Sequence, residues 1–371
     1  METTGDQPHT LVDTAGPPAQ TKPVVPVPHR KKAEHVPDDS SAFINLCEQA
    51  LHPEGLHHVA EYHRGVFNYS VDILDHPLLA RLGKPRGASE GDRALYIRIG
   101  RQLNFLLGRM DSSLRPVESG RLIRTVLRLG QATLFHYYVR PGHYLTGVSL
   151  GKETAEAGDR AMTKLATGFR TGLHQLRIDY GGFIGAPEVS PSSERPAPAE
   201  LPFTPSSAPA HHHREVFGDI GPDADRIGAL CAASLTAKNL HYVAYVDPTS
   251  GFLSTDLLAA EGLAEYHSLI NRQQRRDRYH DISRRLHFVV ARLNHSLKAV
   301  LPGRLTRTVL DVDEGALFYC ALGNGTFLLG VTLHQDRVAY ADDVMTRLTL
   351  GVQRIVTESA DRDDWAVSET T

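Results

Sequence analysis

The chain has 371 residues, more than one ordinary domain needs, and 41% of them are hydrophobic and 22% charged. Forty basic and forty-three acidic residues leave a net charge of -3, which argues against a nucleic-acid-binding protein, because such proteins carry a strongly basic domain or face. Three cysteines without a C-x-x-C pair, no secretory signal pattern and no apolar run of transmembrane length favour a soluble protein of a reducing cytoplasm.

Three segments have a composition that is typical of polypeptide without regular secondary structure. Residues 1–37 are rich in Pro, Thr, Gln and charge, and we expect them to be disordered, because they bury too little apolar area to offset their chain entropy. Residues 183–217 have the same character and predict a Pro/Ser-rich linker. Residues 359–371 form an acidic tail. Two segments that can form cores remain, 38–182 and 218–358.

These two segments are copies of each other. The octet "GRLIRTVL" begins at Gly120 and "GRLTRTVL" begins at Gly303, a shift of 183 positions. The same shift superposes Tyr96 on Tyr279, Leu103 on Leu286, Phe105 on Phe288, Arg109 on Arg292, Asp159 on Asp342 and Met162 on Met345. A shift of 184 aligns the residues at the start of each copy, for example Cys47 with Cys231. Because the shift changes by one, an insertion or deletion of one residue lies in the loop between the two aligned stretches. The period is far longer than a solenoid repeat, so each copy should be a domain.

Each copy predicts the same elements in the same order. A first helix has an apolar stripe that includes Cys47 or Cys231, and a β-hairpin follows, with turn residues at 247–251 in copy two. A long amphipathic helix comes next, then the octet as a strand, two further strands and a last helix. The order α-β-β-α-β-β-β-α predicts an α/β (α+β) fold of two tandem domains. Each would be a five-stranded antiparallel sheet with helices on both faces.

The element order resembles the Roadblock/dynein light-chain family. The second strand "GFLSTDLL" (251–258) and the last strand "LLGVTL" (328–333) carry this resemblance, which extends over both copies, although "YHRGVFNYS" in copy one departs from the pattern. The resemblance implies a non-enzymatic module that dimerises through its middle helix and a sheet edge. It also implies a protein partner such as a small Ras-like GTPase. The two copies could pair within the chain, or two chains could form a homodimer.

The residues that suggest catalysis or metal binding have simpler interpretations. Ser149 lies in "GVSLG", which matches the G-x-S-x-G pattern, but it falls inside a predicted strand rather than at the sharp turn of a nucleophile elbow. His57, His58 and His241 have no cysteine or carboxylate at ligand spacing, so packed histidines are favoured. We therefore predict no catalytic residue, no metal and no cofactor.

Seven arginines are the candidate partner-binding residues: Arg121, Arg124, Arg304 and Arg307 from the octets, and Arg272, Arg275 and Arg276 from the basic run "RQQRRDR". The octet arginines could tie their strand to Asp159 or Asp342 in the last helix, or they could face a partner, in the extreme as an arginine finger. The basic run could be a solvated helix start or a docking surface for an acidic partner.

The sequence thus predicts a cytoplasmic regulatory or scaffold protein that binds a small Ras-like GTPase or another protein, and neither nucleic acid nor membrane. The alternative is a small-ligand sensor of the PAS or GAF type. Exposed apolar side chains on the middle helices would favour the first function, and a closed, polar-lined pocket in one copy would favour the second.

Overall fold

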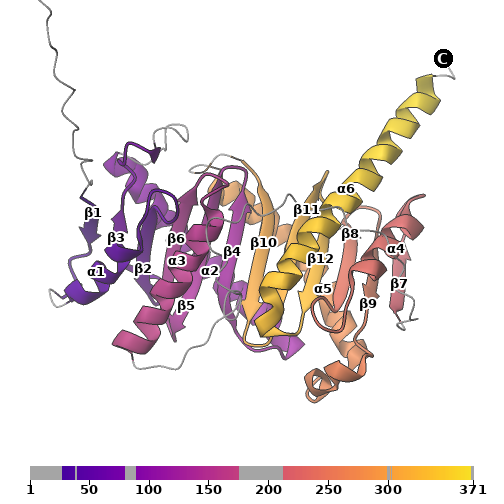
Figure 1. Cartoon of the computed structure of the whole chain (residues 1–371), viewed down its shortest axis with the longest axis horizontal. Coiled ribbons are helices and arrows are strands. Elements are labelled where there is room, and N and C mark those ends of the chain that lie inside the picture. The colour runs from indigo at the N-terminus through magenta and orange to yellow at the C-terminus, as the bar shows by residue number, and fades with distance from the viewer. Residues whose placement is uncertain are drawn as a thin grey trace, which may run out of the picture.

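One antiparallel sheet of twelve strands runs through the whole molecule (Figure 1). The computed structural model describes residues 27–37, 40–79, 89–174, 212–298, 301 and 303–368. The strand order is β1-β3-β2-β6-β5-β4-β10-β11-β12-β8-β9-β7, so copy one supplies the first six strands and copy two the last six. The predicted mixed α/β class and antiparallel pairing are confirmed, but the two sheets are joined into one.

Both copies contain the predicted element order. Copy one consists of β1 (His29–Lys32), α1 (Ser41–Ala50), β2 (His58–His63), β3 (Val66–Asp72), α2 (Glu90–Leu114), η3 (Arg115–Val117), β4 (Leu122–Leu129), β5 (Ala132–Arg140), β6 (His143–Leu150), α3 (Ala155–Thr167) and η4 (Gly168–Leu173). Copy two consists of β7 (His213–Gly218), α4 (Ala224–Ser234), β8 (Tyr242–Asp247), β9 (Gly251–Asp256), η5 (Glu261–His267), α5 (Arg272–Leu297), β10 (Leu305–Val312), β11 (Ala316–Gly323), β12 (Thr326–Thr332), η6 (Gln335–Arg337) and α6 (Val338–Ser368).

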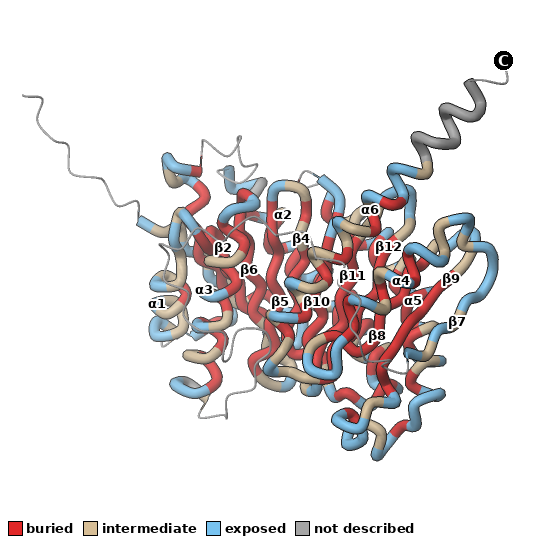
Figure 2. The backbone as a smooth tube through the Cα atoms, turned by 45° about the vertical axis from the view of Figure 1, so that its right-hand side comes forward, coloured by how far each residue is buried: buried red, intermediate tan, exposed pale blue. Residues whose placement is uncertain are grey.

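Helices cover both faces of the sheet. The long helices α2 and α5 lie on one face, and α1, α3, α4 and α6 lie on the other (Figure 1). Each face has its own hydrophobic core, and each core takes residues from both copies, which makes the strands the most buried part of the molecule (Figure 2). The two copies therefore do not have separate hydrophobic cores. Among the described residues, no helix combines the length and the apolar composition that a membrane crossing requires.

The octet strands join the two copies. Strands β4 and β10 pair antiparallel, with Thr125 opposite Leu310 and Val126 opposite Val309. Helices α2 and α5 touch above this junction. The middle helix and a sheet edge of each copy thus meet within one chain.

Two strands and part of one helix lie where the sequence predicts no regular structure. Strand β1 falls within residues 1–37 and pairs with β3, and β7 falls within residues 183–217 and pairs with β9. Helix α6 continues past residue 358 to Ser368. The predictions of disorder, linker and tail are wrong for these stretches. Residues 1–26 and 183–211 lie outside the described part of the chain.

The glycine that opens each octet has a conformational reason. Gly120 has φ +86° and Gly303 has φ +100°, in the left-handed region that side chains with a Cβ rarely adopt. Space is also limited, because a Cβ on Gly303 would lie 2.9 Å from the backbone nitrogen of Gly130 across the junction. The repeated glycines turn the chain into the two strands that join the copies.

Candidate partner-binding surface

Arg124 ties three elements together inside the molecule. Its guanidinium forms an ion pair with Asp159 of α3, and its Nη1 donates to Asp311 of β10 at 2.5 Å. Tyr137 contributes a hydroxyl that donates to Asp159 at 2.5 Å. Arg124 is 5% exposed, so it lies in a buried Arg–Asp pair rather than at the surface. A second carboxylate, from the other copy, joins this pair.

Arg307 occupies the corresponding place in copy two. Its guanidinium forms an ion pair with Asp342 of α6 and donates to the Thr346 hydroxyl. Asp311 of copy two bonds to Arg124 rather than to Arg307, so the two arginines differ in the number of carboxylates they hold. Neither guanidinium reaches the surface, where an arginine finger would have to project.

The basic run at the start of α5 is divided between the interior and the surface. Arg275 is 1% exposed and donates to the Ser119 hydroxyl of copy one at 3.0 Å and to the Tyr266 carbonyl at 2.6 Å. Arg276 forms two hydrogen bonds with Asp256, at 2.7 and 3.0 Å. Arg272 is exposed. The run therefore anchors the helix more than it presents charge.

Arg121 and Arg304 lie at the starts of their octets, nearer to solvent. Arg121 stacks over the Tyr138 ring at 4.3 Å, and its backbone N–H donates to Asp313 of copy two at 2.8 Å. Arg304 is exposed. Of the seven candidate arginines, Arg272 and Arg304 are thus exposed and Arg121 is partly exposed. The other four are held by internal contacts.

The residues considered for chemistry have structural contacts. Ser149 is fully buried in β6, and its hydroxyl donates to the Gly55 carbonyl at 2.6 Å. In both copies a buried histidine bridges two backbone groups: the N–H of Leu150 donates to Nδ1 of His57, and the N–H of Leu333 donates to Nδ1 of His241. No group of His, Cys, Asp or Glu among the described residues is arranged to hold a metal ion.

A different set of residues is exposed at matching positions on both long helices. Arg101, Phe105 and Arg109 on α2 match Arg284, Phe288 and Arg292 on α5, at the shift of 183. All six are exposed, and the two phenylalanines are 59% and 72% exposed. Their spacing of four places each trio on one side of its helix, away from the sheet. We call these six residues the Arg–Phe–Arg stripes.

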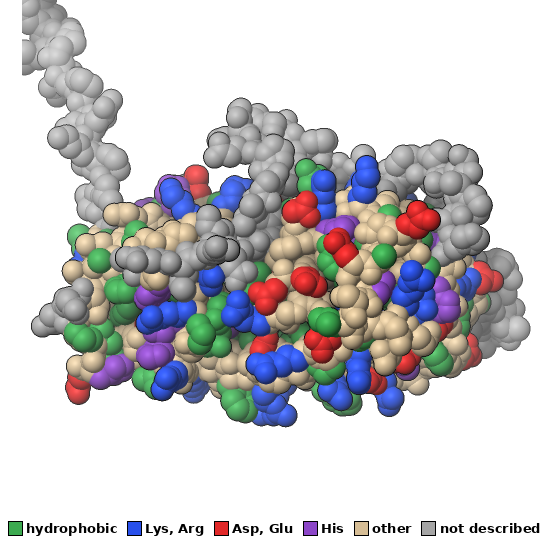
Figure 3. Space-filling model, turned by 90° about the horizontal axis from the view of Figure 1, so that it is seen from below, with side chains coloured by type: hydrophobic (Ala, Val, Ile, Leu, Met, Phe, Trp, Pro, Cys, Tyr) green, Lys and Arg blue, Asp and Glu red, His purple; other side chains and the backbone are tan. Residues whose placement is uncertain are grey.

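The helix face that carries the stripes is basic. Three exposed arginines lie on α2 and five on α5: Arg98, Arg101, Arg109, Arg272, Arg278, Arg284, Arg285 and Arg292. The exposed acidic side chains described on these helices are Glu90, Asp277 and Asp281. Figure 3 shows Lys and Arg side chains along its lower edge, which is the side away from the viewer in Figure 1, where α2 and α5 lie. Basic side chains are thus concentrated on this face, although the chain has a net charge of -3.

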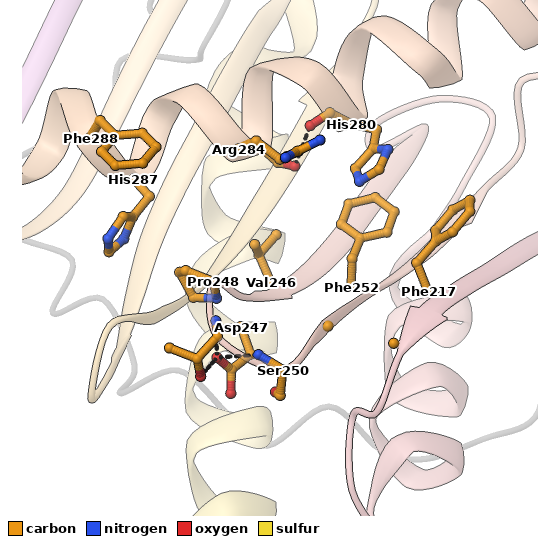
Figure 4. Close-up of a pocket in the computed structure, with 14 residues that line it drawn as sticks. Phe217, Val246, Asp247, Pro248, Ser250, Phe252, His280, Arg284, His287 and Phe288 are labelled. Carbon is orange, nitrogen blue, oxygen red and sulfur yellow. Dashed lines mark hydrogen bonds between the residues drawn. The ribbon is translucent and has the colours of Figure 1, made fainter.

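A groove of about 410 Å³ extends the stripe of copy two. It lies between α5 and the β8–β9 hairpin, with Phe288 and Arg284 on the helix side (Figure 4). Its opposite end is aromatic: His280 stacks on Phe217 with ring centroids 5.2 Å apart and packs against Phe252 at 4.6 Å. The groove could accept an apolar side chain between these rings and Phe288.

The stripes were not among the candidate residues, although the sequence held a signal for them. Phe105 lies outside the apolar stripe of its helix, which contains Leu103 and Leu106, and Phe288 repeats this in copy two. An aromatic residue that is repeated on the polar side of a helix has no role in the core, and this could have marked it. Comparison of the chain with protein-family models, with curated proteins and with solved structures finds no match.

Proposed function

We propose that the chain is a regulatory or scaffold protein that binds a partner protein through the helix face bearing the Arg–Phe–Arg stripes. The observation that carries this proposal is the exposure of Phe105 and Phe288 at matching positions. Large aromatic side chains in water are unfavourable, and exposed aromatic and arginine side chains are enriched at the energetic centres of interfaces. The same exposed trio occurs in both copies.

The partner we propose is a small Ras-like GTPase, the class that the Roadblock resemblance implies. The basic face favours a partner with acidic groups around an apolar centre, because complementary charge raises the rate of association and orients the encounter. Exposed Arg98 on α2 matches exposed Asp281 on α5, so the two halves of the face are not equivalent. One asymmetric partner per chain fits this face better than two identical ones.

The test is a titration of the purified full chain with small Ras-like GTPases from the organism that makes this chain. Each GTPase is loaded with GDP or with a non-hydrolysable GTP analogue. Binding should weaken as salt is raised, because the face is charged. The double variant Arg101→Glu/Arg284→Glu should bind at least about tenfold more weakly, since each reversal puts like charges together across the interface. No binding to any GTPase in either nucleotide state would contradict the proposed partner.

A second candidate function is that of a small-ligand sensor. A pocket of about 520 Å³ in copy one, open to solvent and lined by Glu61, His63 and His143 among others, favours it. The cavity lies on the side of the sheet opposite to the stripes, so the two functions are compatible in one chain.

A further inference from the structure

The cavity in copy one lies between α1 and the ends of β2, β3 and β6. Phe43 of α1 and Val66 of β3 form apolar parts of its wall. Glu61 of β2 and His143 of β6 contribute polar parts, and His174 closes one side. A volume of about 520 Å³ is in the range of cavities that bind small molecules.

Glu61 is an unusual residue for this place. It is 3% exposed, and neither of its carboxylate oxygens has a hydrogen-bond partner among the described residues. An ionisable neighbour is His143, whose Nδ1 lies 3.4 Å from Oε1 of Glu61. Burial raises the pKa of Glu61 to about 7, and Asn68 and Arg140 offset this only in part. A buried carboxyl that accepts no short hydrogen bond destabilises the fold, so its presence calls for a reason outside folding.

Copy two shows that the fold does not need this group. At the positions that match Glu61 and His143, copy two has Tyr245 and Thr326, and at the position of His174 it has Thr357. Tyr245 is buried, and β8 and β12 pair there as β2 and β6 do. The same architecture thus forms with ordinary residues, and the charged cluster belongs to copy one alone.

The charges and rings of the cavity define what would complement it. The rings of His63 and His143 lie 4.4 Å apart, and His174 lies 5.6 Å from His143 and 5.7 Å from Phe43, so a wall of rings stands beside the carboxyl. Rings and a carboxylate together favour an organic ammonium group. Arg140 also lines the cavity and favours an anionic group at a second point.

We infer that this cavity binds a free amino acid with an apolar side chain. Its ammonium group donates to Glu61, its carboxylate accepts from Arg140, and its side chain packs on Phe43 and Val66. A zwitterion of this size compensates both charges of the cavity, and it supplies the hydrogen bonds that Glu61 lacks. The inference gives the sensor function its ligand class, and it does not depend on the helix face.

The experiment is isothermal titration calorimetry of the full chain with the twenty common amino acids, with thermal melting in parallel. L-leucine and L-phenylalanine are expected to bind and to raise the melting temperature. N-acetyl-L-leucine lacks the ammonium group and L-leucinamide lacks the carboxylate, so each should bind at least about tenfold more weakly than L-leucine. Equal binding of either derivative, or no binding of any amino acid at millimolar concentration, would overturn the inference.

Two variants separate a binding role from a folding role. Glu61→Gln should lose amino-acid binding and yet melt at a higher temperature than the parent chain in the absence of ligand, because an uncompensated buried charge is gone. Arg140→Gln should lose binding with little change in melting. Glu54→Gln, which changes an exposed carboxylate of the same copy, is the matched control and should bind as the parent does. Unchanged binding by Glu61→Gln would refute the assignment. All three variants should bind the GTPase normally, which keeps this test separate from that of the helix face.

Discussion

Arg124 and Arg307 show how the same residue in two copies can have different energetic importance. Arg124 compensates two buried carboxylates, Asp159 from its own copy and Asp311 from the other, whereas Arg307 compensates Asp342 alone. A buried charge whose partner is removed costs far more than the net contribution of the pair. The loss of Arg124 should therefore harm the fold more than the loss of its twin.

Arg124→Gln should lower the free energy of unfolding by about 3–5 kcal/mol, because Asp159 and Asp311 lose their counter-charge in the interior. Arg307→Gln should lower it by less, and Arg304→Gln, at an exposed position in the same octet, should change it by no more than about 0.5 kcal/mol. Chemical denaturation of the three variants measures the differences. A smaller effect for Arg124 than for Arg307 would contradict the network described above.

His57 and His241 must be neutral in the folded chain. The nitrogen Nδ1 of each accepts a backbone N–H, so a proton there would break the hydrogen bond. Burial lowers the pKa of both to about 4, and burial also lowers the pKa of His58 to about 4 and of His136 to about 3. In the unfolded chain these histidines take up protons near pH 6.5.

Stability should accordingly fall on acidification. Between pH 6.5 and pH 4 the unfolded state binds protons that the folded histidines do not, so the free energy of unfolding decreases as the pH is lowered through this window. Glu61, whose pKa is raised to about 7, and Asp311, whose pKa is raised to about 6, act in the opposite direction. They are two groups against five, because burial also lowers the pKa of His143 to about 4. We expect a loss of at least about 2 kcal/mol from pH 7 to pH 5, measured by urea denaturation. Exposed His295 serves as a control: His295→Gln should leave the profile unchanged. A flat profile between pH 7 and pH 5 would contradict this account.

At the scale of elements, the pairing of β4 with β10 is selective. The register places Arg124 opposite Asp311 and Arg128 opposite Arg307. Copy one carries Arg128 at the position that matches Asp311, so two copies of copy one would place arginine opposite arginine throughout. Ser119 and Arg275 add a further bond that forms only between unlike copies. The charge pattern thus disfavours pairing of copy one with itself, and the Ser119–Arg275 bond favours pairing of copy one with copy two.

Asp311→Arg tests this selectivity, because it gives copy two the residue that copy one has. The new guanidinium would lie against Arg124 in the interior, and the expected loss of stability is about 3–5 kcal/mol. Hydrogen exchange should accelerate most at the paired amides of β4 and β10. Arg304→Asp makes a charge reversal of equal size at an exposed position and should leave exchange at these strands unchanged. Exchange in Asp311→Arg that matches the parent chain would show that charge does not select the pairing.

The elements differed in how far the sequence could predict them. Duplicated apolar periodicity identified the long helices and the octet strands, because each pattern occurs twice. Strand β1 has the sequence "HRKK", which has no apolar alternation, and it forms by backbone pairing with β3 at the edge of the sheet. Such a strand depends on a partner far away in the chain, so local pattern cannot reveal it. The same holds for Arg275, whose burial depends on Ser119 of the other copy.

For the whole molecule, the fusion of two copies into one sheet determines how the two stripes lie relative to each other. The junction of β4 with β10 and the contact of α2 with α5 bring the two Arg–Phe–Arg stripes onto one continuous basic face. A separate copy would present half of this face. The sequence could predict a paired fold from the duplication and the family resemblance, but the matched exposure of Phe105 and Phe288 becomes evident only when both helices are placed on the sheet.

The measurement that tests this most directly is the affinity of the Phe105→Ser/Phe288→Ser chain for the small Ras-like GTPase proposed as the partner. Both side chains are exposed, so the variant should melt within about 2 °C of the parent, since surface substitutions change stability by no more than about 0.5 kcal/mol. Leu350→Ser changes a comparably exposed apolar residue on α6, on the opposite face of the sheet, and is the matched control. We predict an affinity at least about tenfold weaker for the double variant and unchanged for the control. Equal affinities for the parent and the double variant would contradict the claim that this helix face binds the partner.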